Sequence, residues 1–174
     1  MPVRLRLLRL TPVEAVIECV APPGAEIRGR LAGPTCPYST TIEVAYHVRA
    51  NRIVIPEPAW WDPQSPFLYR GRFEVWRLGA QSEVEQVQIG LRHTVHVDGE
   101  IVHNGRRLEL KTRRVETADE ATLRQLRQTG FNAVEVPAGL AQEVCQIADR
   151  IGLFVTTDAP LSIDPLRHPS AITS

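Results

Sequence analysis

Residues 108–157 read LELKTRRVETADEATLRQLRQTGFNAVEVPAGLAQEVCQIADRIGLFVTT. Three strands are predicted at 108–115, 131–136 and 153–157, the second of them a short apolar run, and a helix is predicted in each of the two stretches between them. Each helical stretch is followed by a glycine, Gly130 or Gly152, which can adopt the left-handed conformation that ends a helix. Strands and helices alternating with short joins indicate right-handed crossovers and a parallel sheet.

Local signals support both predicted helices. Thr117-Ala-Asp-Glu120 has the threonine and glutamate of a capping box, so the first helix is expected to begin there. In the second helix the apolar residues share one face, namely Leu140, Val144, Ile147, Ala148 and Ile151. After 160 the sequence has prolines and small polar residues without any period, so this tail is expected to fray.

Upstream, residues 3–97 follow a period of two. Ile42, Val44, Tyr46 and Val48 alternate with more polar neighbours, which predicts a half-buried strand. Similar runs recur between Pro- and Gly-containing turns, and a hairpin is expected at 103–105. Several strands at this spacing without helical segments favour an antiparallel sandwich of about a hundred residues.

The composition excludes several classes of partner. Lys and Arg number 20, as do Asp and Glu, so no net field attracts nucleic acid or an anionic membrane. No stretch approaches the roughly 20 apolar residues of a membrane span, and Glu14 and Glu18 interrupt the only candidate for a signal-peptide core. A cytoplasmic location is therefore expected, with neither nucleic acid nor membrane as a partner.

Cofactor and metal motifs are also missing from the sequence. Cys19, Cys36 and Cys145 form no Cys-x-x-Cys pair, which argues against a disulfide framework and a structural zinc site. His93 and His96 are three residues apart on a predicted strand and therefore point to opposite faces. Phosphate-binding and dinucleotide-binding glycine loops are missing too, so neither a metal nor a cofactor is expected.

Five segments carry a family resemblance. Ile55-Pro-Glu-Pro-Ala-Trp-Trp-Asp-Pro-Gln-Ser-Pro-Phe-Leu-Tyr69 resembles the segment that closes the immunoglobulin-like domain of glycoside hydrolase family 2, the β-galactosidase and β-glucuronidase type. The other four follow in the family's order, and they are Gly90-Leu-Arg-His-Thr-Val-His-Val97, Asn104-Gly105, Gly130-Phe-Asn-Ala-Val134 and Asp149-Arg-Ile-Gly-Leu-Phe-Val155. Together the matches span about residues 55–160.

The resemblance implies an α+β fold. An antiparallel immunoglobulin-like β-sandwich is expected at 1–98, a partial (β/α) barrel, or TIM-barrel, segment of about three parallel strands and two helices at 99–160, and an irregular tail at 161–174. It also implies O-glycosyl hydrolysis by two glutamates at the fourth and seventh barrel strands. The three predicted strands include neither position, so the chain is expected to be a truncated glycosidase without catalytic residues.

The strand ends depart from the family pattern. Thr112-Arg-Arg-Val-Glu116, Glu135-Val-Pro-Ala-Gly139 and Thr157-Asp-Ala-Pro160 replace the polar runs that the resemblance would place around a sugar. Glu116, Glu135 and Asp158 could form vestigial carboxylates on the rim where barrel active sites lie, although charged strand ends are more often solvated or paired. Trp60 and Trp61 could stack on a sugar, but filling the core is the favoured interpretation.

Three functional hypotheses follow. The first is a partial family 2 glycosidase that is inactive as this chain, with carbohydrate as its ancestral substrate. The second is a non-catalytic module that binds carbohydrate or protein, and the third is a structural spacer. In each case three parallel strands leave an open edge and an uncovered face. We therefore expect the C-terminal part to pack on the sandwich, to associate with itself or a partner, or to be marginally ordered.

Overall fold

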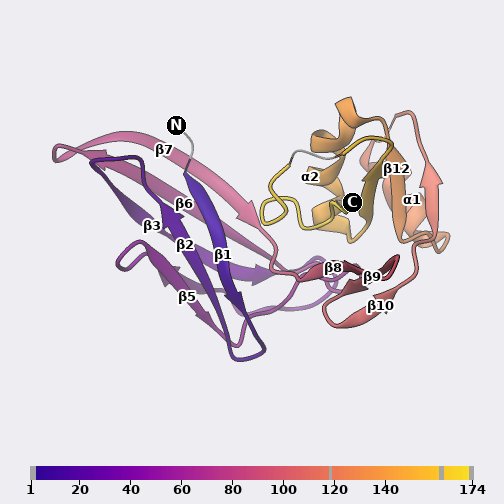
Figure 1. Cartoon of the computed structure of the whole chain (residues 1–174), viewed down its shortest axis with the longest axis horizontal. Helices are drawn as coiled ribbons and strands as arrows, with labels where there is room; N and C mark the ends of the chain where they lie inside the picture. The colour runs from indigo at the N-terminus through magenta and orange to yellow at the C-terminus, as the bar shows by residue number, and fades with distance from the viewer. Residues whose placement is uncertain (1–2, 118, 161–162, 173–174) are drawn as a thin grey trace.

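The computed structural model describes residues 3–117, 119–160 and 163–172. The expectations for residues 1–2, for Ala118 within the capping motif and for 161–162 and 173–174 lie outside the described residues. Figure 1 shows a sandwich at one end of an elongated molecule and a helix-bearing parallel sheet at the other. A small antiparallel sheet lies where the two meet (Figure 1). Neither helix in the described ranges is long and apolar enough to cross a lipid bilayer.

The described part of the sandwich contains seven strands in two antiparallel sheets. One sheet has the order β1-β2-β5 and the other the order β4-β3-β6-β7. The strands are β1 (Arg4–Leu10), β2 (Glu14–Val20), β3 (Ala25–Thr35), β4 (Val44–His47), β5 (Arg52–Pro56), β6 (Leu68–Arg77) and β7 (Ala80–Ile89). The predicted antiparallel sandwich is confirmed.

Alternation along the strands builds the sandwich core. Ile17 and Ile53 of one sheet and Leu31 and Phe73 of the other are fully buried in one cluster, while their neighbours face outward. The strand expected from Ile42 onward begins only at Val44. Because β4 is an edge strand that pairs with residues 30–33 alone, Ile42 lies beyond the paired segment and is exposed.

The junction sheet contains β8 (Thr94–Val97), β9 (Glu100–His103) and β10 (Arg106–Leu108). The expected hairpin is confirmed, since β9 and β10 pair across Asn104-Gly105. The single strand expected at 108–115 is wrong: Leu108 pairs antiparallel with β9, whereas β11 (Thr112–Arg114) pairs in parallel with β12. Asn132 stabilises the bend between them by accepting from the Lys111 N–H at 2.6 Å and donating to the Glu109 carbonyl at 2.8 Å.

The parallel sheet has the order β11-β12-β13. Along the chain, β11 is followed by α1 (Glu120–Gln128), β12 (Ala133–Val136), the 3₁₀ turn η1 (Ala138–Leu140), α2 (Ala141–Ile151) and β13 (Phe154–Thr157). The helix ends expected at Gly130 and Gly152 are confirmed, with φ values of 95° and 77°. The predicted Thr117 cap is wrong: Asp119 is the N-cap and accepts from the Thr122 N–H at 2.8 Å, because it directly precedes the helix and its carboxylate reaches the free amides of the first turn.

The prediction that the tail frays is also wrong for the C-terminal segment, residues 163–172. Ala171 forms a parallel bridge with Val155 of β13, the Val155 N–H donates to the Ser170 carbonyl at 2.9 Å, and Leu166 joins the sandwich core. Figure 1 shows this segment, in yellow, between the sandwich and α2. Its contacts lie far away in sequence, so no local period reveals them. The C-terminal part therefore packs on the sandwich, the first of the three expected outcomes.

Candidate functional site

The three carboxylates singled out from the sequence lie at the carboxyl ends of the parallel strands. The register places Arg114 beside Glu135 and Glu135 beside Thr156. Glu116 follows β11 by two residues, and Asp158 directly follows β13. Carboxyl ends of parallel strands meet at one edge, so this rim is where barrel-type sites form.

Arg114 connects the rim carboxylates. Its Nε lies 3.2 Å from Glu116 Oε1, and its Nη1 lies 3.1 Å from Glu135 Oε1. The hydrogen bond that Arg114 donates to Glu116 is the largest of the effects that raise the pKa of Arg114, and the charges of Glu135 and Asp158 act in the same direction. The structure thus brings Glu116 and Glu135 together on one cation, while Asp158 is exposed and acts on it only through its charge.

This geometry differs from that of a retaining glycosidase. Such an enzyme places two carboxylates roughly 5 Å apart on opposite sides of the scissile bond, one as nucleophile and one as acid. Here Glu116 and Glu135 each give an oxygen to the same guanidinium, and the Glu116 side chain is 71% exposed. The rim is an exposed ion-pair network.

The two tryptophans have different environments. Trp61 is fully buried, and its indole N–H donates to the Asp149 carbonyl of α2 at 2.8 Å. Its ring meets Phe154 of β13 edge to face, with centroids 5.3 Å apart. Trp60 is half-buried. Trp61 therefore fastens the sandwich to the parallel sheet, and no face of its ring is open to a sugar.

His103, which the sequence did not single out, lies beneath this contact. Asn104 Nδ2 is 3.2 Å from His103 Nε2, and Thr94 Oγ1 is 2.8 Å from Nδ1. An amide N–H can only donate, so Nε2 accepts and Nδ1–H donates to Thr94, which assigns a neutral ring. Burial, followed by the nearby Arg92 charge, lowers the His103 pKa to about 4. The Asn-Gly turn was the only sequence signal near this residue.

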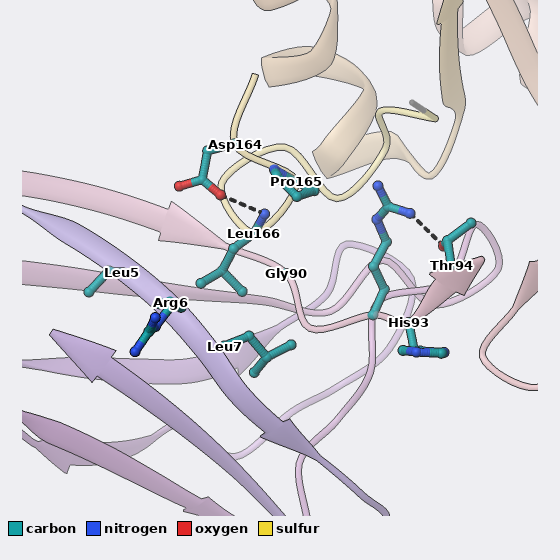
Figure 2. Close-up of a pocket in the computed structure, with 10 residues that line it drawn as sticks. Leu5, Arg6, Leu7, Gly90, His93, Thr94, Asp164, Pro165 and Leu166 are labelled. Atoms are coloured by element: carbon teal, nitrogen blue, oxygen red, sulfur yellow. Dashed lines mark hydrogen bonds between the residues drawn. The ribbon is translucent and has the colours of Figure 1, made fainter. Parts of the chain in front are cut away.

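A cavity of about 380 Å³ opens between β1, residues 90–94 and the C-terminal segment. Figure 2 shows Leu5 and Leu7 on one side and Asp164, Pro165 and Leu166 above them. The guanidinium of Arg92, which also lines it, donates to Thr94 Oγ1 and to the Ala171 carbonyl.

Burial lowers the pKa of Arg92 to about 10, against the opposing charge of Asp149, so the side chain stays cationic at neutral pH. Its Nε has no partner among the described residues. Both donated bonds run to neutral oxygens of β8 and the C-terminal segment. Arg92 therefore connects the sandwich side of the junction to the C-terminal segment.

Asp149 of α2 and His168 and Ser170 of the C-terminal segment form a cluster but not a catalytic triad. The buried Asp149 carboxylate accepts from the Ser170 hydroxyl at 2.5 Å and lies 3.2 Å from His168 Nδ1. A nucleophilic serine would donate to the histidine, whereas Ser170 donates to the carboxylate and is itself fully buried. The cluster anchors the C-terminal segment on α2.

The part of the chain that the structure describes contains no candidate metal site. No group of three or more His, Cys, Asp or Glu side chains there could hold an ion. His93 and His96 are both exposed, near the start of β8 and within it.

Residues 34–92 match the model of glycosyl hydrolases family 2, a range that contains the whole segment 55–69. The family recognised from the motifs is thereby confirmed over this range. No curated protein sequence matches the chain.

Solved structures show the same fold at low identity. The β-glucuronidase of Ruminococcus gnavus is 16% identical with a TM-score of 0.67, covering 98% of this chain and 35% of that one. The β-D-glucuronidase of Dictyoglomus thermophilum is 16% identical with a TM-score of 0.65, covering 91% of this chain and 28% of that one. The β-glucuronidase of Parabacteroides merdae is 16% identical with a TM-score of 0.62, covering 98% of this chain and 27% of that one. The chain spans about a quarter to a third of the length of these proteins.

Proposed function

We propose, from the premise that residues 34–92 are a glycosyl hydrolase family 2 domain, that this chain is a partial family 2 glycosidase unit that does not cleave glycosidic bonds by itself. The observation that carries the proposal is the Arg114 bridge. Because Glu116 and Glu135 share one guanidinium, these two carboxylates do not form an opposed pair on either side of a scissile bond. The two glutamates that the resemblance assigns to the fourth and seventh barrel strands have no counterpart on β11, β12 or β13.

The same premise supports a division of the chain. We take 1–98 as an immunoglobulin-like sandwich, 99–160 as a partial (β/α) barrel segment and 161–174 as a tail. The three-stranded parallel sheet with its two helices supports the barrel assignment. Carbohydrate is the proposed class of ligand. A second copy or another protein could add a strand to the outer edge of β11, which pairs only with β12 among the described strands.

The test is a hydrolysis assay on the purified chain. The p-nitrophenyl β-glucuronide, β-galactoside and β-glucoside should release no product above buffer. A Glu116→Gln/Glu135→Gln variant is the matched control, since it removes two of the three rim carboxylates, both at exposed or half-exposed positions. Turnover by the wild-type chain that disappears in this variant would refute the proposal.

The second hypothesis, a non-catalytic binding module, is favoured by one specific observation. A polar cleft lies between the sandwich and α2, away from the strand-end rim.

A further inference from the structure

A cleft of about 360 Å³ separates the sandwich edge strand β7 from helix α2. Gln86 and Gln88 line one wall and Gln142 and Gln146 the other, with Arg167 and His168 of the C-terminal segment also lining it. Pockets that take small organic ligands begin at about this volume. The cleft is built from three parts of the chain that meet only in the folded protein.

The four glutamines face the cleft because of the local periods. Gln86 and Gln88 alternate with the buried Val87 and Ile89, so they face away from the sandwich core. Gln142 and Gln146 are four residues apart on the exposed side of α2 and therefore share one face. None of these amide groups has a hydrogen-bond partner among the described residues, so each offers two donors and an acceptor.

The arginines of the cleft are already occupied. Arg167 donates to Glu85 Oε1 at 2.7 Å and to the Val3 carbonyl at 2.5 Å. Arg150 donates to the Gln146 carbonyl at 2.9 Å and lies 3.4 Å from Glu120 Oε2. Because these cations have acidic partners, the cleft favours a neutral hydrogen-bonding ligand over a phosphate or sulfate.

His168 adds a ring whose orientation is fixed. Its Nδ1 lies 3.2 Å from the buried Asp149 carboxylate, which can only accept, so Nδ1 carries a proton and Nε2 is the ring nitrogen left for a ligand. The Asp149 carboxylate fixes the ring, since its other oxygen accepts from the Ser170 N–H at 3.0 Å.

We infer that this cleft binds a neutral carbohydrate through its hydroxyl groups. A sugar hydroxyl both donates and accepts, and the four amides with His168 offer both roles around one space of suitable size. Among the described residues no Trp, Tyr or Phe side chain lines the cleft, so hydrogen bonds alone would give weak binding, on the order of millimolar. The class of ligand rests on the proposed function, and the new element is the place where that ligand binds.

The experiment titrates the ¹⁵N-labelled full chain with methyl β-glucoside and methyl β-galactoside and follows backbone amide shifts. Shifts should concentrate at 86–88, 142–150 and 167–168. A Gln142→Ala/Gln146→Ala variant should bind the same sugar about tenfold or more weakly, because it removes one wall of amides. Alanine is the best helix former, so α2 should persist, which circular dichroism verifies.

The matched control is Gln125→Ala/Gln128→Ala, which removes two exposed glutamines from α1. Its affinity should stay within about twofold of wild type. Absence of shifts in the cleft, or equal binding by the Gln142→Ala/Gln146→Ala variant, would overturn the inference. Product release from chromogenic glycosides would instead refute only the proposed function, so the two failures are distinguishable.

Discussion

Acidification from pH 7.5 to about 5 should weaken the junction through His103. This ring is 4% exposed, accepts from Asn104 and lies against the aromatic rings of Trp61 and Phe154. Protonation would place a second N–H against the Asn104 amide and add a charge near Arg92. The folded state therefore resists a proton that the unfolded chain accepts.

The magnitude follows from the pKa, which falls from 6.5 to about 4 on folding. Below pH 6.5 the unfolded state binds the proton and the folded state does not, so this stabilisation is complete above pH 6.5 and is lost as the pH falls to 4. The total is about 3 kcal/mol, of which about 2 kcal/mol is lost by pH 5.

Urea unfolding followed by circular dichroism at several pH values measures the effect. The stability of a His103→Gln variant should fall less steeply between pH 7.5 and 5, by about 2 kcal/mol. The control His47→Gln changes an exposed histidine of β4 and should keep the wild-type slope. Parallel pH profiles for wild type and His103→Gln would refute the neutral, buried assignment.

Three further changes test the junction and the first helix. Trp61→Phe should cost about 2–3 kcal/mol in urea unfolding, because it loses the indole hydrogen bond and part of the packing. Trp76→Phe, at a half-buried position, should cost less. Gly152→Ala should cost at least about 2 kcal/mol, since φ is 77° and the new Cβ would lie 2.1 Å from the Pro63 carbonyl oxygen; unchanged stability would contradict this packing. Asp119→Ala should lower the helical circular dichroism signal and speed amide exchange in α1, and identical exchange would exclude the cap.

Features with a local cause were predictable. Alternation set the two faces of the sandwich strands, and the Asn104-Gly105 turn set the β9–β10 hairpin. The glycines Gly130 and Gly152 ended the helices because each takes a positive φ. In each case the responsible interactions lie within a few residues, so a short window of sequence contains them.

The errors share a different cause. The strand expected at 108–115 divides because Leu108 and Thr112 pair with different sheets. The C-terminal segment has no period of its own, yet Leu166 enters the sandwich core and Ala171 pairs with β13. Thr112 pairs with Ala133 and Ala171 with Val155, so these contacts depend on partners outside any short window, and a local pattern carries no information about them.

The candidate sites show the same division. Sequence alone identified Glu116, Glu135 and Asp158 as strand-end carboxylates and favoured a packing role for Trp61. Only the tertiary structure joined the two glutamates through Arg114 and brought β7 against α2 to form the glutamine cleft. Residue identity fixes which groups can donate, accept or carry charge, whereas their partners depend on distances between segments, which are set when the chain buries its apolar surface in three dimensions.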